Sequence, residues 1–98
     1  MKTLVKTIAL AAMLTLPALA ADAGCYADYK AKRDNPLKLH YGVVALPDAA
    51  CGSLKAASAN ISQRLAANGW ILLNVLSIFD ASGLPQRKKS AGEYYLRY

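Results

Sequence analysis

The stretch RLAANGWILLNV, residues 64–75, decides the fold of this chain, because a helix ends in it and a strand begins. An alanine-rich run stops at Asn68-Gly69, and glycine there adopts the left-handed conformation that ends helices without steric cost. Trp70 then falls where a helix-ending motif places an apolar side chain against the last turn, near Leu65. We therefore predict structural roles for Gly69, Trp70 and Leu65, and favour core packing of Trp70 over stacking on a ligand.

Before this junction, apolar residues recur at intervals of three and four along residues 54–65. The spacing predicts an amphipathic helix that runs to about residue 68, with Asp48 and Ser53 as candidate caps. The helix packs on a sheet by one narrow stripe, formed by Leu54, Ile61 and Leu65.

After the junction, residues 70–79 are apolar on both period-two faces, which predicts a central strand covered on both sides. Residues 37–46 alternate between apolar and polar side chains and predict a half-buried strand. Residues 80–92 are rich in turn formers and charge, so a loop is expected there. Residues 93–98 predict a last strand, antiparallel to the central one.

The segment of residues 21–36 is interpreted as a short amphipathic helix or turn. Tyr26 and Tyr29 stand at helical spacing beside basic residues, and Asp34-Asn35-Pro36 stops any helix.

These elements predict an α+β fold with a small mixed three-stranded sheet in the order β-α-β-β. One main helix packs on one face of the sheet, and residues 37–98 form the domain. Because the helix is a crossover connection, residues 37–46 and 70–79 are expected to be parallel if they are neighbours. The second face of the central strand must then meet the N-terminal segment or a partner.

The first twenty residues have the pattern of a secretory signal peptide. Lys2 and Lys6 precede a short apolar run, and Ala18-Leu19-Ala20 supplies small residues at a cleavage site after Ala20. The apolar run is too short to span a bilayer. We therefore expect a periplasmic or secreted protein without a transmembrane anchor after cleavage.

Removal of 20 of the 98 residues leaves 78, with ten basic and six acidic residues and a formal charge of +4. A domain this small has a marginal core and usually needs a staple. Cys25 and Cys51 are predicted to form a disulfide in an oxidising compartment. One alternative stays open, because Ala23-Gly24-Cys25 is similar to the site at which a lipoprotein is cut before a lipidated cysteine.

The residues LAANGWILLNV, followed by a loop and YYLRY, resemble a widespread bacterial family of small domains of unknown function. The resemblance covers roughly residues 39–98 and rests on Asn68-Gly69-Trp70, the apolar run after it, and Tyr94 to Tyr98. It implies a strand, a helix, a Gly-Trp pair and two further strands. It implies no activity, substrate or catalytic residue. The signal and the cysteine pair make this chain an exported form.

Catalytic and metal chemistry find little support in the sequence. His40 is the only histidine, and no carboxylate or nucleophile is recognisable at a spacing that would make it a general base. We interpret His40 as a surface residue on the outward face of a strand. One histidine and two distant cysteines do not make a typical zinc site, and no cofactor motif is present. An enzyme is therefore only a remote alternative.

Two surface features suggest binding instead. Six tyrosines in so small a chain suit a contact surface, although tyrosine also fits half-buried strands. A non-enzymatic module that binds a protein partner or self-associates is the leading hypothesis, with Tyr26, Tyr29, Tyr95 and Tyr98 as its candidate surface. The alternative is binding of an anionic envelope component or polymer, with nucleic acid disfavoured by the modest charge. Its candidate residues are Arg87, Lys88, Lys89, Lys30, Lys32 and Arg33.

Overall fold

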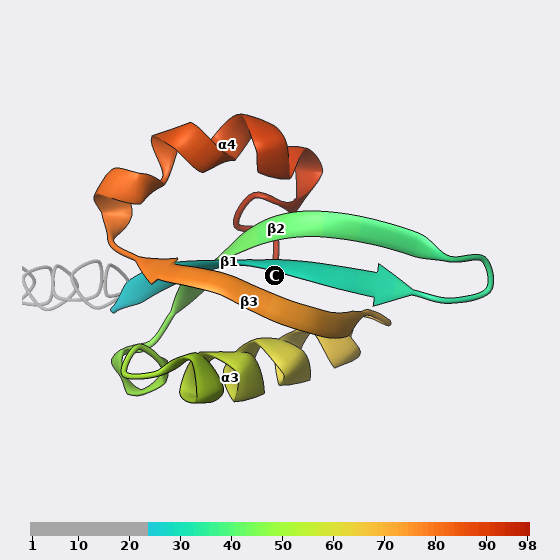
Figure 1. Cartoon of the computed structure of the whole chain (residues 1–98), viewed down its shortest axis with the longest axis horizontal. Coiled ribbons are helices and arrows are strands. Elements are labelled where there is room, and N and C mark those ends of the chain that lie inside the picture. The colour runs from blue at the N-terminus through green and yellow to red at the C-terminus, as the bar shows by residue number, and fades with distance from the viewer. Residues whose placement is uncertain (1–23) are drawn as a thin grey trace, which may run out of the picture.

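The computed structural model describes residues 24–98, so the proposed signal peptide lies outside the described part of the chain. Three strands and two α-helices form an α+β fold, as predicted, with α3 on one face of the sheet and α4 on the other (Figure 1). Short 3-10 turns precede α3 and flank α4. The elements are β1 Cys25–Arg33, β2 Lys38–Leu46, α3 Leu54–Ala66, β3 Ile71–Phe79 and α4 Pro85–Ala91.

The central strand is β1, so the helix or turn expected for residues 21–36 is wrong. The sheet order is β2-β1-β3, and both neighbours run antiparallel to β1. Ala27, Tyr29 and Ala31 are fully buried on one face of β1. Tyr26 and Tyr29, three residues apart, mimic helical spacing. The small side chains of Ala27 and Ala31, on either side of Tyr29 on the buried face, allow α3 to approach the sheet.

Strand β3 lies at an edge of the sheet, so the prediction of a central strand at residues 70–79 is wrong. Strands β2 and β3 are not neighbours, because β1 lies between them, and the sheet is antiparallel rather than mixed. Since each is antiparallel to β1, β2 and β3 still run in the same direction. Helix α3 is thus a crossover that passes over the central strand.

Helix α3 begins and ends as the sequence predicts. Ser53 caps it, because its hydroxyl accepts a hydrogen bond from the Ala56 backbone N–H. Gly69 has a φ of 82°, and the Trp70 backbone N–H donates to the Leu65 carbonyl at 3.0 Å. This is the expected left-handed helix ending. Its buried stripe is Ala57, Ile61 and Leu65, whereas Leu54 is exposed.

Trp70 packs in the core, as predicted. Its ring is buried, and the indole Nε1 donates to the Tyr98 hydroxyl at 3.2 Å. The Arg33 guanidinium lies over the ring, 4.0 Å from its centroid. The tryptophan therefore fastens the end of α3 to β1 and to the C-terminal segment.

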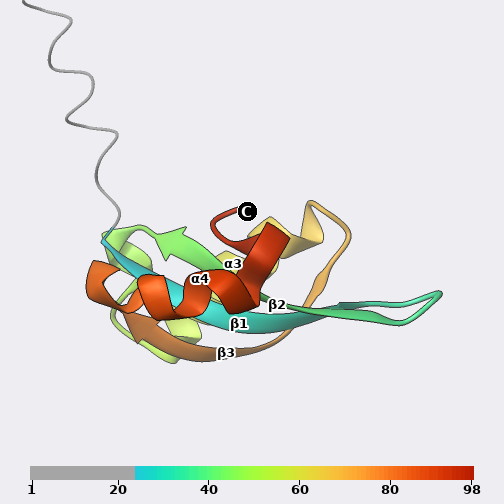
Figure 2. The same ribbon diagram turned by 90° about the horizontal axis from the view of Figure 1, so that it is seen from above.

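The C-terminal quarter differs from the prediction. The loop expected at residues 80–92 contains helix α4, which begins at Pro85, where proline suits the first helical position. Gly92, with a φ of 53°, ends α4. The strand expected at residues 93–98 is a 3-10 turn and an extended tail that makes a single bridge, between Tyr95 and Val43 on β2. Figure 2 shows this segment turning back over the sheet.

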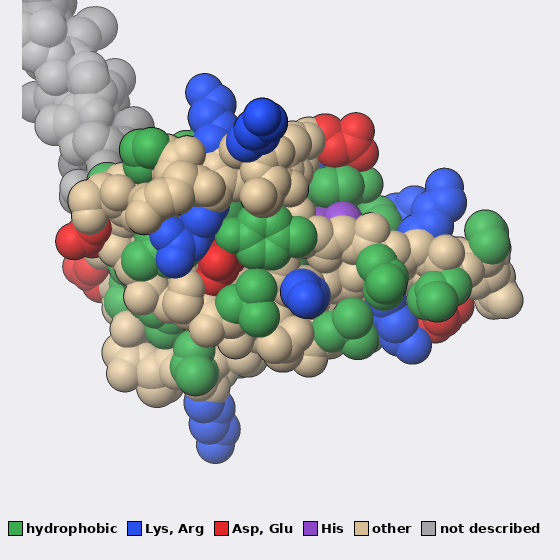
Figure 3. Space-filling view, turned by 45° about the horizontal axis from the view of Figure 1, so that its top comes forward, with side chains coloured by type: hydrophobic (Ala, Val, Ile, Leu, Met, Phe, Trp, Pro, Cys, Tyr) green, Lys and Arg blue, Asp and Glu red, His purple; other side chains and the backbone are tan. Residues whose placement is uncertain are grey.

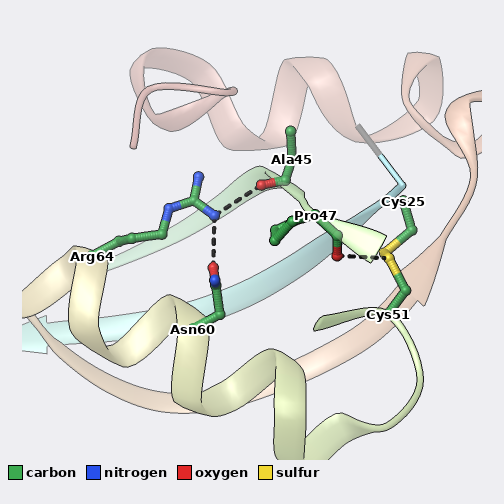
Figure 4. The surroundings of a disulfide bond; sticks show 6 residues. All are labelled: Cys25, Ala45, Pro47, Cys51, Asn60 and Arg64. Carbon is green, nitrogen blue, oxygen red and sulfur yellow. Dashed lines mark hydrogen bonds between the residues drawn. A yellow bond between two sulfur atoms is a disulfide. The ribbon is translucent and has the colours of Figure 1, made fainter. Parts of the chain in front are cut away.

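The predicted disulfide between Cys25 and Cys51 is present and joins the start of β1 to the turn before α3 (Figure 4). Cys25 is therefore not lipidated in this structure. Nearby, Arg64 donates from Nη1 to the Ala45 carbonyl and to the Asn60 side-chain oxygen, which ties α3 to β2.

None of the helices among residues 24–98 is long and apolar enough to cross a bilayer.

Candidate functional site

Helix α4 covers only part of the second sheet face. It is held there by Asp28, whose buried carboxylate accepts hydrogen bonds from Tyr41, Ser77 and Arg87 at 2.7–3.0 Å. Burial alone would raise the pKa of Asp28, but these three hydrogen bonds outweigh it and leave the pKa below its usual value. The network fixes α4 near one end of the sheet and leaves the other end of this face open.

The open end of the face holds a groove of about 320 Å³. Its lining includes Lys30 on β1, Leu39 and Tyr41 on β2, and Leu73 on β3. Along β1 and β2, these residues alternate with residues whose side chains lie on the opposite face of the sheet. Ala31 and His40 complete the lining, which is mostly apolar with one ammonium group. In the space-filling view, hydrophobic and basic side chains gather over this end of the molecule (Figure 3).

The two edges of the sheet differ in their cover. At the β2 edge, the Leu96 backbone N–H donates to the Val43 carbonyl at 2.8 Å, so the C-terminal segment closes part of that edge. Within residues 24–98, no backbone hydrogen bond joins the outer edge of β3 to another segment. The open edge of the sheet is therefore β3.

Strand β3 also exposes apolar side chains. Ile71, Leu73 and Leu76 are 50%, 49% and 42% exposed. The pairing of β3 with β1 skips Leu73 and Leu76, so both leucines stand at irregularities of the strand that turn them outward. Residues 71–79 contain no charged side chain and no proline, the residues that commonly protect an edge strand. We call Ile71, Leu73 and Leu76 the β3 edge surface.

His40 lies behind this face, in an aromatic cluster on the α3 side. Its ring stacks on Tyr94 at 3.7 Å between centroids and meets the edge of Trp70 at 4.3 Å. Its Nε2 shares a hydrogen bond of 2.8 Å with the Tyr29 hydroxyl. Gly42 makes this possible, because a Cβ at that position would overlap the Tyr29 phenol.

The surface position predicted for His40 is wrong, because the residue is only 8% exposed. Burial lowers the pKa of His40, and the Arg33 cation lowers it further. Glu93 acts in the opposite direction, and Arg97 adds a small further lowering. Burial also raises the pKa of Tyr29 well above its usual range. The pair is thus neutral and closed to solvent, an arrangement suited to packing.

Acidification is expected to destabilise the protein through His40. The lowered pKa means that the unfolded chain binds a proton more readily than the folded one, so the free energy of unfolding falls as the pH drops below about 6.5. Urea unfolding at about pH 7.5 and about pH 5.5 measures the loss, which one group limits to about 1.4 kcal/mol per pH unit. The variant His40→Gln should lose this slope. An equal slope in both proteins would contradict the assignment.

The six basic residues predicted as an anion site do not form one cluster. Arg87 is bound to Asp28 and lies over the Phe79 ring, and Lys88 lies 5.7 Å from the Tyr95 ring centroid. Residues 87–89 are in helix α4, not in a hairpin loop. On β1, Lys30 and Lys32 are on the α4 face, whereas Arg33 lies over Trp70 on the other face.

The four candidate tyrosines also separate. Tyr29 is fully buried, so its assignment to a partner surface is wrong. Tyr98 contributes to the aromatic cluster and bonds Trp70. Tyr26 packs near Phe79 with ring centroids 6.4 Å apart, and Tyr95 pairs with β2. Only Tyr26 and Tyr95 remain partly exposed without a bond to the core tryptophan.

The β3 edge surface is not among the sites that the sequence pattern predicts. The signal was present, since an uncharged run of nine apolar and small polar residues suits an edge as well as a centre. Two apolar faces predict a strand covered on both sides, but the irregular pairing of β3 with β1 leaves Leu73 and Leu76 exposed.

Among residues 24–98, no group of three or more His, Cys, Asp or Glu side chains is arranged to hold a metal ion. The disulfide is typical of proteins outside the cytoplasm. Comparisons of the chain with models of protein families, with curated proteins and with solved structures give no match, and the resemblance to a family of small bacterial domains stays a prediction.

Proposed function

We propose that the protein is an exported, non-enzymatic module that self-associates, two copies pairing through their β3 edges. The observation that carries the proposal is the β3 edge surface, an open and uncharged edge with half-exposed apolar side chains. An edge of this kind presents unpaired N–H and C=O groups to a second strand. Antiparallel pairing of identical edges gives a closed twofold dimer.

The chemistry of the edge favours a second copy of the chain over an unrelated partner. A formal charge of +4 on the processed chain makes copies repel each other over most of their surface, but no charge lies on β3 itself. The edge is therefore the place where two copies meet with the least electrostatic repulsion. Burial of Leu73 and Leu76 in the contact supplies the apolar area that a stable interface needs.

A non-enzymatic role fits the chemistry of the described residues. His40 is closed to solvent and hydrogen-bonded to a tyrosine, and Asp28 is held by three donors. Among the described residues, the Asp28 carboxylate is used to hold helix α4 and the His40 ring is packed against Tyr94 and Trp70. For location, we propose the periplasm or the cell exterior, supported by the disulfide and by the leader-like pattern of residues 1–20.

Sedimentation velocity of the processed protein tests self-association. We expect monomer at about 1 µM and a growing dimer fraction at about 100 µM. The double variant Leu73→Lys, Leu76→Lys places like charges on the edge and should remain monomeric at both concentrations. The control Leu54→Lys adds a charge at an exposed leucine of α3, away from β3. It should form dimer to the same extent as the wild type.

A wild-type protein that stays monomeric at about 100 µM would contradict the proposal. The proposal would also be contradicted if the double variant still dimerised and the control Leu54→Lys did not. The first result would leave binding of a different protein as the alternative, and the second would place the self-association interface outside β3.

A further inference from the structure

The most exposed large apolar side chains of the described chain lie at the turn between β1 and β2. Leu37 and Leu39 are 63% and 65% exposed. We call residues 30–39 the hairpin tip. In Figures 1 and 2 the hairpin formed by β1 and β2 projects beyond the ends of α3 and β3.

The hairpin tip is also strongly basic. It holds four cations, Lys30, Lys32, Arg33 and Lys38, against one carboxylate, Asp34, for a net charge of +3. Asp34 lies 3.5 Å from Lys32. Lys30 and Lys38 make no ion pair within residues 24–98. Lys38, between Leu37 and Leu39 in the sequence, and Lys30, which lines the groove together with Leu39, therefore remain available to an anion.

Behind the tip, the open groove continues the same chemistry. Leu39 and Leu73 form its walls, and Lys30 contributes its ammonium group. Apolar side chains flanked by lysines therefore extend from the turn to the open end of the second sheet face. This pattern matches the boundary of a lipid leaflet, where acyl chains lie directly below anionic phosphates.

The shape decides between a membrane and a protein partner. A convex apolar tip needs a matching pocket on a protein, whereas the acyl boundary of a bilayer deforms around it. The positive charge of the tip complements a negatively charged leaflet, which attracts lysines near its surface. A small anionic polymer would satisfy the lysines but would leave the leucines in water.

We propose that the hairpin tip docks on a bilayer that contains anionic phospholipid, with Leu37 and Leu39 inserted at the acyl boundary and Lys30, Lys32 and Lys38 at the phosphates. The inserted residues lie outside the β3 edge surface that self-association uses, and only Leu73 borders both surfaces. Docking gives an exported protein without a spanning helix among residues 24–98 a reversible hold on a membrane surface.

Flotation of the processed, disulfide-bonded protein with vesicles tests the docking. Vesicles of phosphatidylglycerol and phosphatidylcholine are compared with vesicles of phosphatidylcholine alone, at about 1 µM protein, where the chain is expected to be monomeric. We expect at least about tenfold stronger partitioning to the anionic vesicles, weakened by added salt. The variant Leu37→Ser, Leu39→Ser should lose about tenfold of that partitioning.

Matched controls separate the tip from the rest of the surface. Leu54→Ser removes an exposed leucine from α3 and should leave partitioning unchanged. The double variant Lys30→Glu, Lys38→Glu should reduce partitioning at least about fivefold per lysine. The double variant Lys55→Glu, Lys89→Glu makes the same charge change outside the hairpin tip and should reduce partitioning less. The fluorescence of Trp70, which is buried in the folded protein, shows whether each variant is folded.

Equal partitioning to both kinds of vesicle, or none to either, would overturn the inference. Loss of partitioning in the lysine variant but not in the leucine variant would overturn it too, because that result describes a polymer-type anion site. Sedimentation of the wild-type protein distinguishes the two proposals: a chain that dimerises at about 100 µM but fails to float with anionic vesicles overturns only the membrane role.

Discussion

Replacement of Trp70 by alanine is expected to lower the free energy of unfolding by about 3–5 kcal/mol, the largest loss from any single substitution that we predict. The indole is buried where α3, β1 and the C-terminal segment meet. Truncation leaves a cavity beside His40, removes the hydrogen bond to Tyr98 and takes away the ring over which Arg33 lies. A small domain has few kcal/mol to lose, so the variant should be partly unfolded at room temperature.

Urea unfolding followed by far-ultraviolet circular dichroism measures this loss, since the substitution removes the fluorescent reporter. Trp70→Phe is the matched control, because it keeps most of the apolar volume and loses the Nε1 donor. We expect it to cost about 1–2 kcal/mol. A loss below about 1 kcal/mol for Trp70→Ala would mean that the ring contributes little to the core, and the helix-ending role would have to be abandoned.

Removal of the disulfide is expected to cost about 3.5 kcal/mol in the chain-entropy account. The bond closes a loop of 26 residues that contains the whole of β2, and it fixes the start of the central strand to the turn before α3. Without it, the unfolded chain gains conformational freedom that the folded chain does not. The variant Cys25→Ala, Cys51→Ala should therefore unfold at a much lower urea concentration than the wild type.

Reduction with dithiothreitol provides the control for this prediction. The reductant should bring the wild-type midpoint close to that of the double alanine variant and should not move the variant itself. An unchanged wild-type midpoint under complete reduction, checked by thiol titration, would show that the bond does not stabilise the fold.

The parts of the fold that the sequence predicts correctly are those that follow local rules. Ser53, the apolar stripe of α3 and the Asn68-Gly69-Trp70 ending each act within one or two turns of a helix, so their spacing is sufficient. The same holds for β2, whose range is shifted by a single residue at its start. The cysteine pair follows from the compartment and the size of the chain.

The parts that the sequence did not predict depend on contacts between distant segments. Five of the nine residues of β1 are Ala, Asp or Lys, which have low strand propensity, and β1 is a strand because it pairs on both sides. Helix α4 is stable where Arg87 meets Asp28, 59 residues earlier in the chain. His40 is buried because the C-terminal segment folds back and Tyr94 stacks on it. No local pattern indicates these pairings.

The candidate surfaces show the same division. The basic run at residues 87–89 stands out in the sequence, but its first member serves to hold α4. The leucines and lysines of the hairpin tip are evident in the sequence, but the alternation of residues 37–46 predicts that Leu37 and Leu39 are buried. In the structure both leucines are exposed. Their exposure follows from the length of the hairpin beyond the region that the helices cover.

Hydrogen–deuterium exchange at two concentrations tests the proposed pairing of β3 edges most directly. At about 100 µM the outward-facing amides of Ile71–Phe79 should exchange more slowly than at about 1 µM, because a second strand protects them, while the amides of β2 should not change. Equal exchange of β3 at both concentrations, or protection that appears on β2 instead, would contradict the account.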